Sequence, residues 1–157
     1  MGILNVENLN QNQVDAKKAF EGGYNCAESV SKIVATHFDL DAKSITGIAT
    51  GFGGGISRHG LTCGALTGGV ISISAVINNN FRKSHDSAIK KKITEKVQTL
   101  FKEFEKEFGS INCRELTNCN FLEESGLKKF REQQIQNNVC EHLVTWSVKK
   151  TIELLEK

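Results

Sequence analysis

The sequence predicts an all-α protein, a single compact bundle of about six helices with a glycine-rich loop. Proline is absent from all 157 residues, so the strongest helix breaker is missing and glycine and asparagine end the helices. Apolar side chains recur at steps of three and four along several segments, which is the spacing of amphipathic helices. With 39% hydrophobic and 24% charged residues, the chain has the composition of a globular protein. Its length suits one domain.

The predicted domain spans residues 1–157, of which residues 1–10 form a loose N-terminal arm. A first helix follows from about Asn12 to Glu21 and ends at the glycine pair Gly22-Gly23. A short helix is expected from about Asp41 to Thr50, directly before the glycine-rich loop. Since no linker-like stretch divides the chain, we expect these elements to belong to one core.

Cys26 is predicted to open a helix. Asn25 precedes it as the N-cap, and Glu28 stands at the capping-box spacing. The thiol shares its helix face with a stripe at helical spacing, namely Val30, Ile33, Val34 and His37. The same local pattern returns in Asn112-Cys113-Arg114-Glu115, so Cys113 is expected to open a short helical turn.

The glycine-rich loop from Gly51 to Gly60 is expected to deliver Cys63 to the first turn of a buried helix, with Thr62 as the N-cap. Each glycine in that helix costs about 1 kcal/mol relative to alanine, so close packing of another helix must compensate. The same small residues could instead serve a homodimer contact. The alternation from Val70 to Ile77 also fits a strand, an alternative that the sequence leaves open.

The clearest helical pattern runs from Ser84 to Phe108 and ends at Gly109. A less regular helix is expected from about Leu122 to Gln134. The last helix is predicted to begin at its N-cap, Asn138, which puts Cys140 in the first turn on the apolar side.

Four of the five cysteines therefore fall in the first turn of a predicted helix, where backbone N–H groups and the helix dipole stabilise a thiolate: Cys26, Cys63, Cys113 and Cys140. We expect them to meet around one redox or metal centre. Cys119 lies in an asparagine-flanked loop and is expected to be exposed and dispensable to the site. An odd number of cysteines argues against a complete disulfide framework.

Thiols that converge leave three uses open. Four thiolates can bind an iron–sulfur cluster or a tetrahedral zinc ion. Pairs of thiols can also cycle between dithiol and disulfide, which would make the same four cysteines the redox thiols of a metal-free oxidoreductase. In the third interpretation, the cysteines only fill the core of a structural or interaction module. Whether the protein is an enzyme is left undecided by the sequence.

The glycine-rich loop is expected to bring backbone close to the thiol site, and Arg58 and His59 could supply positive charge or hydrogen bonds to it. We predict five residues beside the cofactor, namely Gly53, Gly54, Gly55, His59 and Gly64. The loop lacks the spacing of phosphate-binding motifs, so no nucleotide is expected. The absence of a C-x-x-C-H sequence excludes covalently attached haem of the c type.

The net charge and the hydropathy of the chain limit the classes of partner that we expect. A net charge of +2 predicts neither nucleic acid nor an anionic membrane surface as a ligand. No run reaches the ~18 to 20 apolar residues of a membrane span, and the N-terminus lacks the features of a secretory signal. We therefore expect a cytoplasmic protein whose partner is an electron-transfer protein of unknown identity.

The residues around these cysteines resemble the redox-active protein family named for its cysteine pattern, C_GCAxxG_C_C. The resemblance rests on residues 23–28, 51–55, 61–68 and 109–116 and on the late Cys140. It implies an all-helical domain with a redox role and carries the four pattern cysteines to Cys26, Cys63, Cys113 and Cys140. A similar cysteine domain in split-Soret cytochromes is associated with an iron–sulfur site, which favours a cluster, with [2Fe–2S] as a candidate, over zinc. One departure is that Cys63 precedes Gly64, whereas the family name writes glycine before cysteine.

Overall fold

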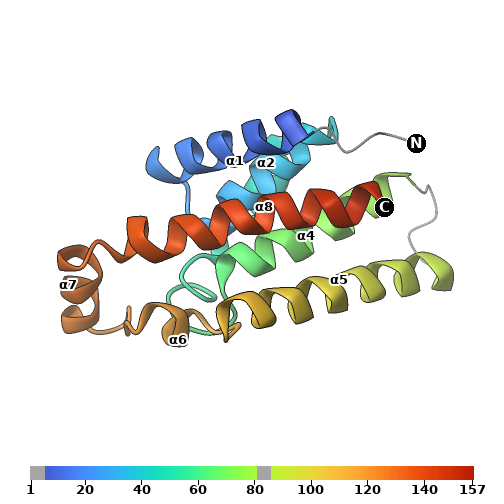
Figure 1. Ribbon diagram of the computed structural model, residues 1–157. Helices are drawn as coiled ribbons and strands as arrows, with labels where there is room; N and C mark the ends of the chain where they lie inside the picture. Colours follow the sequence, from blue (N-terminus) through green and yellow to red (C-terminus); the bar gives the residue numbers. More distant parts are fainter. Residues whose placement is uncertain (1–5, 81–85) are drawn as a thin grey trace.

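Eight α-helices build the described part of the chain, residues 6–80 and 86–157 of the computed structural model (Figure 1). The helices are α1 (Val6–Glu21), α2 (Cys26–His37), α3 (Ala42–Ala49), α4 (Gly64–Asn80), α5 (Ser87–Phe108), α6 (Cys113–Thr117), α7 (Glu124–Glu132) and α8 (Glu141–Glu156). A 3-10 turn, Thr50–Phe52, follows α3, and a π-helical turn, Gln136–Cys140, precedes α8. The all-α prediction is confirmed, but the number of about six helices was too low because short helices such as α6 add to the count.

Helix α4 lies in the middle of the bundle. It packs against α2, α5 and α8, while α1 covers α2 and α8 (Figure 1). The strand alternative for residues 70–77 is wrong, since these residues lie inside α4. Its polar Ser72 is buried, and the hydroxyl donates a 2.8 Å hydrogen bond to the Gly68 carbonyl one turn earlier. The alternating polar residue is therefore satisfied within the helix.

The glycines of α4 are used inside the chain. A Cβ added at Gly68 would lie 2.7 Å from the Ala27 carbonyl oxygen of α2. One added at Gly69 would lie 2.7 Å from Leu100 of α5 and 2.8 Å from the Thr151 hydroxyl of α8. The small residues thus let three helices approach α4, as the sequence predicted for close packing. This internal use removes the argument for a homodimer contact, and the oligomeric state stays a prediction.

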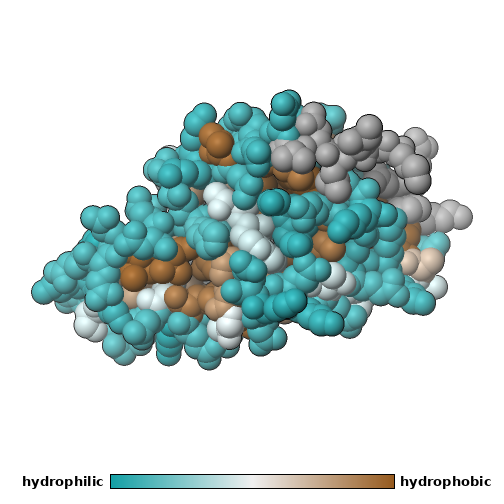
Figure 2. All heavy atoms as spheres, in the orientation of Figure 1, coloured by the Kyte–Doolittle hydropathy of each residue, from teal (hydrophilic) through white to brown (hydrophobic). Residues whose placement is uncertain are grey.

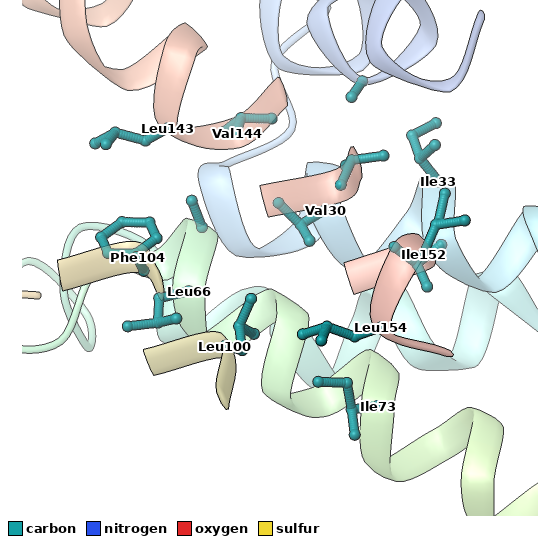
Figure 3. Packing of buried hydrophobic residues seen from close by; sticks show 14 of the residues in the cluster. Val30, Ile33, Leu66, Ile73, Leu100, Phe104, Leu143, Val144, Ile152 and Leu154 are labelled. Atoms are coloured by element: carbon teal, nitrogen blue, oxygen red, sulfur yellow. The ribbon is translucent and has the colours of Figure 1, made fainter. Parts of the chain in front are cut away.

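The hydrophobic core lies where α2, α4, α5 and α8 meet (Figure 3). Its largest fully buried side chains come from all four helices and include Val30, Leu66, Ile73, Leu100, Phe104, Val144 and Ile152. Burying a side chain of this size contributes about 1.5–3 kcal/mol. The helical scaffold therefore has a large apolar core, to which Cys63 also belongs.

The ends of two helices differ from expectation. Helix α1 begins at Val6, so residues 6–10 are helical and not a loose arm, because buried Leu9 anchors this turn to the core. Residues 1–5 of the predicted arm lie outside the described residues. Helix α5 begins at Ser87, where the Asp86 carboxylate accepts a 2.8 Å hydrogen bond from the Ala88 N–H. The predicted start at Ser84 also falls outside the described residues.

Polar residues cover most of the face drawn in Figure 2, and apolar residues gather toward the end that carries α7. Among the described residues, no helix is both long enough and apolar enough to cross a membrane.

Candidate redox centre

Cys26 is the first residue of α2, as predicted. The Asn25 side chain accepts a 3.0 Å hydrogen bond from the Glu28 N–H, and the Glu28 carboxylate accepts one of 2.8 Å from the Asn25 N–H. Both halves of a capping box are thus present. The Thr50 hydroxyl donates to Glu28 at 2.7 Å, and the Asn25 amide donates to the Thr50 carbonyl at 3.0 Å. These bonds tie the end of α3 to the start of α2 and fix the backbone that carries Cys26.

The loop after α3 folds over Cys26 through a run of left-handed backbone. Five consecutive residues have positive φ angles between 47° and 71°, namely Gly54, Gly55, Ile56, Ser57 and Arg58. Three of them are not glycine, and each such residue costs roughly 1–2 kcal/mol in this conformation. Backbone strain of this kind persists only where the surrounding structure enforces it, and it clusters at functional sites.

Cys63 and Cys113 are held on two paired backbone segments. The Cys63 N–H donates to the Ile111 carbonyl at 2.8 Å, and the Cys113 N–H donates to the Leu61 carbonyl at 2.7 Å. These bonds flank the isolated antiparallel bridge between Thr62 and Asn112. Residues 50 positions apart in the sequence therefore become neighbours.

Pairing with the segment around Asn112 also corrects the predicted start of the central helix. The Cys63 carbonyl accepts hydrogen bonds from the N–H groups of Leu66 and Thr67, both at 3.0 Å, so Cys63 is the N-cap residue and α4 begins at Gly64. Thr62 is not the N-cap because its backbone belongs to the bridge. Cys113 does begin α6 as predicted, although the Asn112 side chain makes no capping hydrogen bond there.

Cys140 ends the π-helical turn that leads directly into α8. The predicted N-cap role of Asn138 is wrong, because its N–H and side-chain amide donate backward to Gln134 and Gln133, at 2.9 Å and 3.1 Å. The turn itself supplies partners for the first N–H groups of α8, so no side-chain cap is needed. Single π-helical turns inside helices occur frequently at functional sites.

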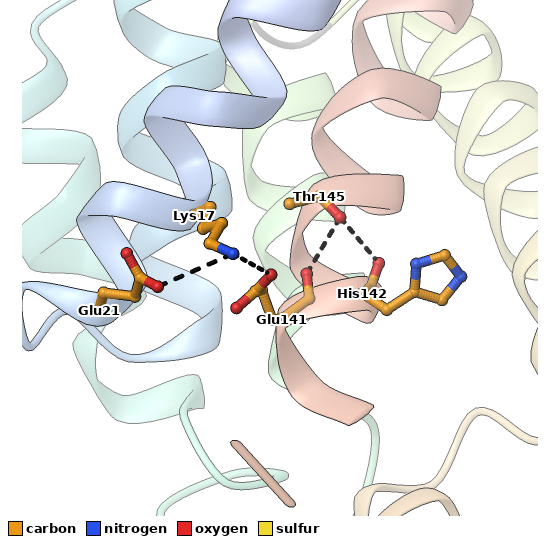
Figure 4. Close-up of polar contacts among 5 residues, drawn as sticks. All are labelled: Lys17, Glu21, Glu141, His142 and Thr145. Carbon is orange, nitrogen blue, oxygen red and sulfur yellow. Dashed lines mark hydrogen bonds and ion pairs between the residues drawn. The ribbon is translucent and has the colours of Figure 1, made fainter. Parts of the chain in front are cut away.

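An ion pair fixes the start of α8 beside the end of α1. The Lys17 ammonium lies 2.9 Å from the Glu141 carboxylate and 3.9 Å from that of Glu21 (Figure 4). The Thr145 hydroxyl donates to the carbonyls of Glu141 and His142, at 3.0 Å and 3.2 Å. Since Cys140 precedes Glu141, these contacts position Cys140 relative to the segment that runs from α1 to Cys26.

Three of the four pattern cysteines line one cavity of about 460 Å³: Cys26, Cys113 and Cys140. Cys63 does not line this cavity and is buried, with 4% of its surface exposed. Each of the other three thiols would raise the pKa of Cys63 by its negative charge if ionised. Three of the thiols thus lie on one cavity wall, and a shared centre of all four cysteines stays a prediction.

Burial is the largest influence on all four thiols. It raises the pKa of Cys26, Cys63 and Cys140 and raises that of Cys113 to about 12. At Cys26, backbone N–H groups of Gly54, Ala27, Cys26 and Gly64 lower the pKa in opposition. The cysteines are thus neutral thiols near pH 7 in the absence of a cation, although the Cys26 sulfur faces donors that would stabilise negative charge.

The donor set has the chemistry of a site for a soft metal, since thiolates are the ligands of zinc and of iron–sulfur clusters. All five cysteines are free thiols. Within residues 6–80 and 86–157, however, no three or more His, Cys, Asp or Glu side chains lie close enough together to hold a metal ion. The thiols surround a cavity, and their placement does not form a ready ligand group around one point.

Of the five residues predicted beside a cofactor, two line the cavity and three do not. Gly53 and Gly54 line the cavity. Gly55 and Gly64 are buried behind it, where an added Cβ would meet Cys113 and Cys26, respectively. His59 is exposed and does not line the cavity, and its ring contacts the Ile56 carbonyl at 3.0 Å. Contact of any of these residues with a cofactor stays a prediction.

Cys119 was expected to be exposed, and this was wrong. Only 2% of its surface is exposed, and its charge would raise the pKa of Cys113 and Cys140. The left-handed Asn118, with φ of 51°, turns the chain inward at this point. Thr117 connects the two neighbouring cysteines, because its hydroxyl donates to the Cys113 carbonyl at 2.7 Å and accepts from the Cys119 N–H at 3.3 Å.

The aromatic wall of the cavity was missed by sequence reasoning. It consists of Phe20, Tyr24, Phe121 and Phe130. The rings of Phe121 and Phe130 pack edge to face, with centroids 5.1 Å apart. Tyr24 could have been noticed because it stands two residues before Cys26. No periodic signal marks Phe121 or Phe130, since their segments are short and mostly polar.

Free cysteines gathered around one cavity in an all-helical scaffold define a protein with a candidate thiol redox centre. The chain belongs to the C_GCAxxG_C_C family, described as "Putative redox-active protein", which matches residues 24–154. The match includes all the cysteines discussed above. Searches of curated proteins and of solved structures gave no match.

Proposed function

We propose that this protein transfers electrons or senses redox state through an iron–sulfur cluster bound by Cys26, Cys63, Cys113 and Cys140, with [2Fe–2S] as the expected type. The observation that carries the proposal is that Cys26, Cys113 and Cys140, from three separate parts of the chain, line one cavity of about 460 Å³. Cys63 is buried close enough for their charges to influence its pKa. The chain's membership of a redox-active family supports the same centre. A reducing cytoplasmic location and an electron-transfer protein as partner complete the proposal.

Burial of the thiols favours a bound cation over bare thiol chemistry. Disulfide exchange begins with a thiolate, and burial disfavours the thiolate at Cys63 and Cys113 in particular. A bound metal cation reverses this effect, because coordinating thiols are deprotonated outright. The four cysteines are therefore better suited to hold a cationic iron centre than to react unaided.

The chain's own groups would serve such a centre in distinct ways. The thiolates of the four cysteines would be its ligands, and the N–H groups of Gly54 and Gly64 would offset negative charge at Cys26. Gly53 and Gly55 would keep the loop close to the site. When bound, an iron–sulfur cluster supplies reversible one-electron chemistry.

Anaerobic purification tests the proposal. The full chain is expressed with iron supplementation and purified without oxygen, and iron, acid-labile sulfide and visible absorption are measured per chain. We expect stoichiometric iron and sulfide with charge-transfer bands that bleach on reduction. A colourless sample free of iron and sulfide after anaerobic purification contradicts the proposal.

A second candidate is a metal-free dithiol–disulfide couple, favoured by the backbone bridge that makes Cys63 and Cys113 neighbours. In this reaction glutathione disulfide would oxidise two thiols to one internal disulfide and leave as two molecules of reduced glutathione. Differential alkylation and mass spectrometry after such treatment should then find one defined disulfide that a reductant reverses. Mixed or random pairing counts against this candidate.

A further inference from the structure

The cavity beside the thiols has a wall suited to an organic ligand. Its volume of about 460 Å³ is within the range of small-molecule sites, roughly 300–1,000 Å³. Four aromatic side chains line it, contributed by α1, α7 and the segments before α2 and α7: Phe20, Tyr24, Phe121 and Phe130. Flat aromatic walls favour planar ring systems, which stack or pack edge to face on them.

Arg58 gives the same cavity a single cationic group. It is the one charged residue among the described residues that line the cavity. Its guanidinium has no hydrogen bond or ion pair to the described part of the chain. The Lys32 ammonium, by contrast, lies over the Tyr24 ring, 5.2 Å from its centroid. A guanidinium that has no partner in the protein is available to bind a carboxylate, sulfonate or phosphate group through two parallel N–H···O hydrogen bonds.

The described residues that line the cavity include no aspartate or glutamate. The remaining polar lining residues are uncharged, namely Asn25, Thr50, Ser57 and Gln136. Because Arg58 is positively charged, the cavity favours a ligand that carries a negative charge.

We propose that this cavity binds a small planar aromatic anion, with its rings against Phe121 and Phe130 and its acidic group at Arg58. The inference deepens the proposed function, since such a molecule would lie beside the redox centre as its substrate or effector. It does not require that the thiols bind iron.

Calorimetric titration of the full chain with naphthalene-2-sulfonate tests the inference under anaerobic conditions. We expect saturable binding at one site per chain. Butane-1-sulfonate, which keeps the charge but lacks the rings, should bind at least tenfold more weakly. Absence of saturable naphthalene-2-sulfonate binding at millimolar concentration overturns the inference, as does equal binding of the two sulfonates.

Matched variants assign the contacts. Arg58→Gln should weaken naphthalene-2-sulfonate binding about tenfold and change binding of neutral 2-naphthalenemethanol less than twofold. Arg131→Gln removes an exposed arginine of α7 that does not line the cavity, and it should leave both affinities unchanged. Phe130→Leu should weaken both aromatic ligands about threefold. Equal losses in Arg58→Gln and Arg131→Gln contradict the assignment of Arg58.

Iron content measured on the same preparations separates this inference from the proposed function. An iron-free preparation that still binds the aromatic sulfonate supports the cavity and contradicts the cluster. A preparation that contains the cluster but binds no aromatic sulfonate supports the cluster and contradicts the ligand site in the cavity.

Discussion

The hydrophobic core and the cysteine cavity lie in one helical bundle but are held together by different means. In the core, side chains at helical spacing on α2, α4, α5 and α8 pack against one another (Figure 3), and each is less than 9% exposed. Around the cavity, backbone bonds, a capping box, a left-handed loop and a π-helical turn fix the cysteines. The packed core stabilises the fold, whereas the strained backbone around the cavity costs folding free energy that the rest of the structure offsets.

The cavity is lined by a charged side chain, Arg58, whereas the buried polar side chains of the described residues, such as Ser72 and Thr151, are uncharged. A tightly packed core loses stability when any side chain shrinks. The cavity already contains space, so its side chains are free to be chosen for chemistry. Mutations in the two regions should therefore have effects of different size and kind.

The largest loss of stability is expected for Phe104→Ala in the core. Phe104 is fully buried, and truncation of such a side chain costs about 3–5 kcal/mol of unfolding free energy. Phe121→Ala at the cavity wall, where space already exists, should cost less than about 2 kcal/mol. Urea unfolding of both variants measures the comparison, and equal losses would contradict the division into two regions.

A smaller loss of stability is expected for Gly64→Ala, which would place a methyl group of α4 against the Cys26 thiol. The new Cβ would overlap the Cys26 sulfur and lie 3.0 Å from the Phe52 carbonyl oxygen. Overpacking of this kind costs about 1–3 kcal/mol and should displace the Cys26 thiol.

Gly47→Ala is the matched control, because an added Cβ at this helical position of α3 meets no atom within 4 Å. It should stabilise the protein by about 0.5–1 kcal/mol. The two variants are compared by chemical unfolding and by thiol alkylation. A Gly64→Ala protein as stable as wild type, with an unchanged Cys26 alkylation rate, would sink the steric argument.

Raising the pH should weaken the reduced, metal-free protein through its buried thiols. The pKa of Cys113 rises from an ordinary value of 9.0 to about 12 on folding. Below pH 9 the thiol is neutral in both states, so its contribution to stability is fully present. Above pH 9 only the unfolded state ionises, and the contribution is lost as pH rises toward 12.

The expected loss from Cys113 alone is about 1–2 kcal/mol between pH 9 and about pH 10.5. Unfolding by urea in the presence of reductant measures it, with Cys113→Ser as the comparison because serine does not titrate. The variant should lose less stability over the same interval. Parallel curves for the two proteins would mean that Cys113 ionises as easily folded as unfolded.

The smallest effect separates the two Asn-Cys segments. Asn25 caps α2 through its side chain, so Asn25→Ala should cost about 1 kcal/mol of unfolding free energy. Asn112 makes no such bond before α6, and Asn112→Ala should change stability by a few tenths of a kcal/mol. Thermal and urea unfolding measure both. A larger loss at Asn112 than at Asn25 would reverse the structural assignment.

Local signals in the sequence predicted the parts of this protein that depend on neighbours along the chain. The capping box at Asn25 and Glu28 placed the start of α2 correctly, and the apolar stripe up to Phe108 with Gly109 placed the end of α5. Both features are complete within a few turns of helix, so pattern and structure agree.

Features that depend on distant contacts were not predictable in detail. Cys63 became an N-cap residue because its segment pairs with residues near Cys113, and Cys119 became buried because Asn118 turns the chain inward. The cavity wall of Phe121 and Phe130 arises from packing of short segments with no periodicity. The candidate site was thus found through its cysteines, while its shape required the fold.

Iron content of single alanine variants after anaerobic purification tests the central claim most directly. If one centre uses Cys26, Cys63, Cys113 and Cys140, replacing any of the four should reduce iron per chain to a small fraction of the wild-type value. Cys119→Ala, which removes the fifth and also buried cysteine, should retain it. Wild-type iron content in any of the first four variants, or equal loss in Cys119→Ala, would contradict a shared four-cysteine centre.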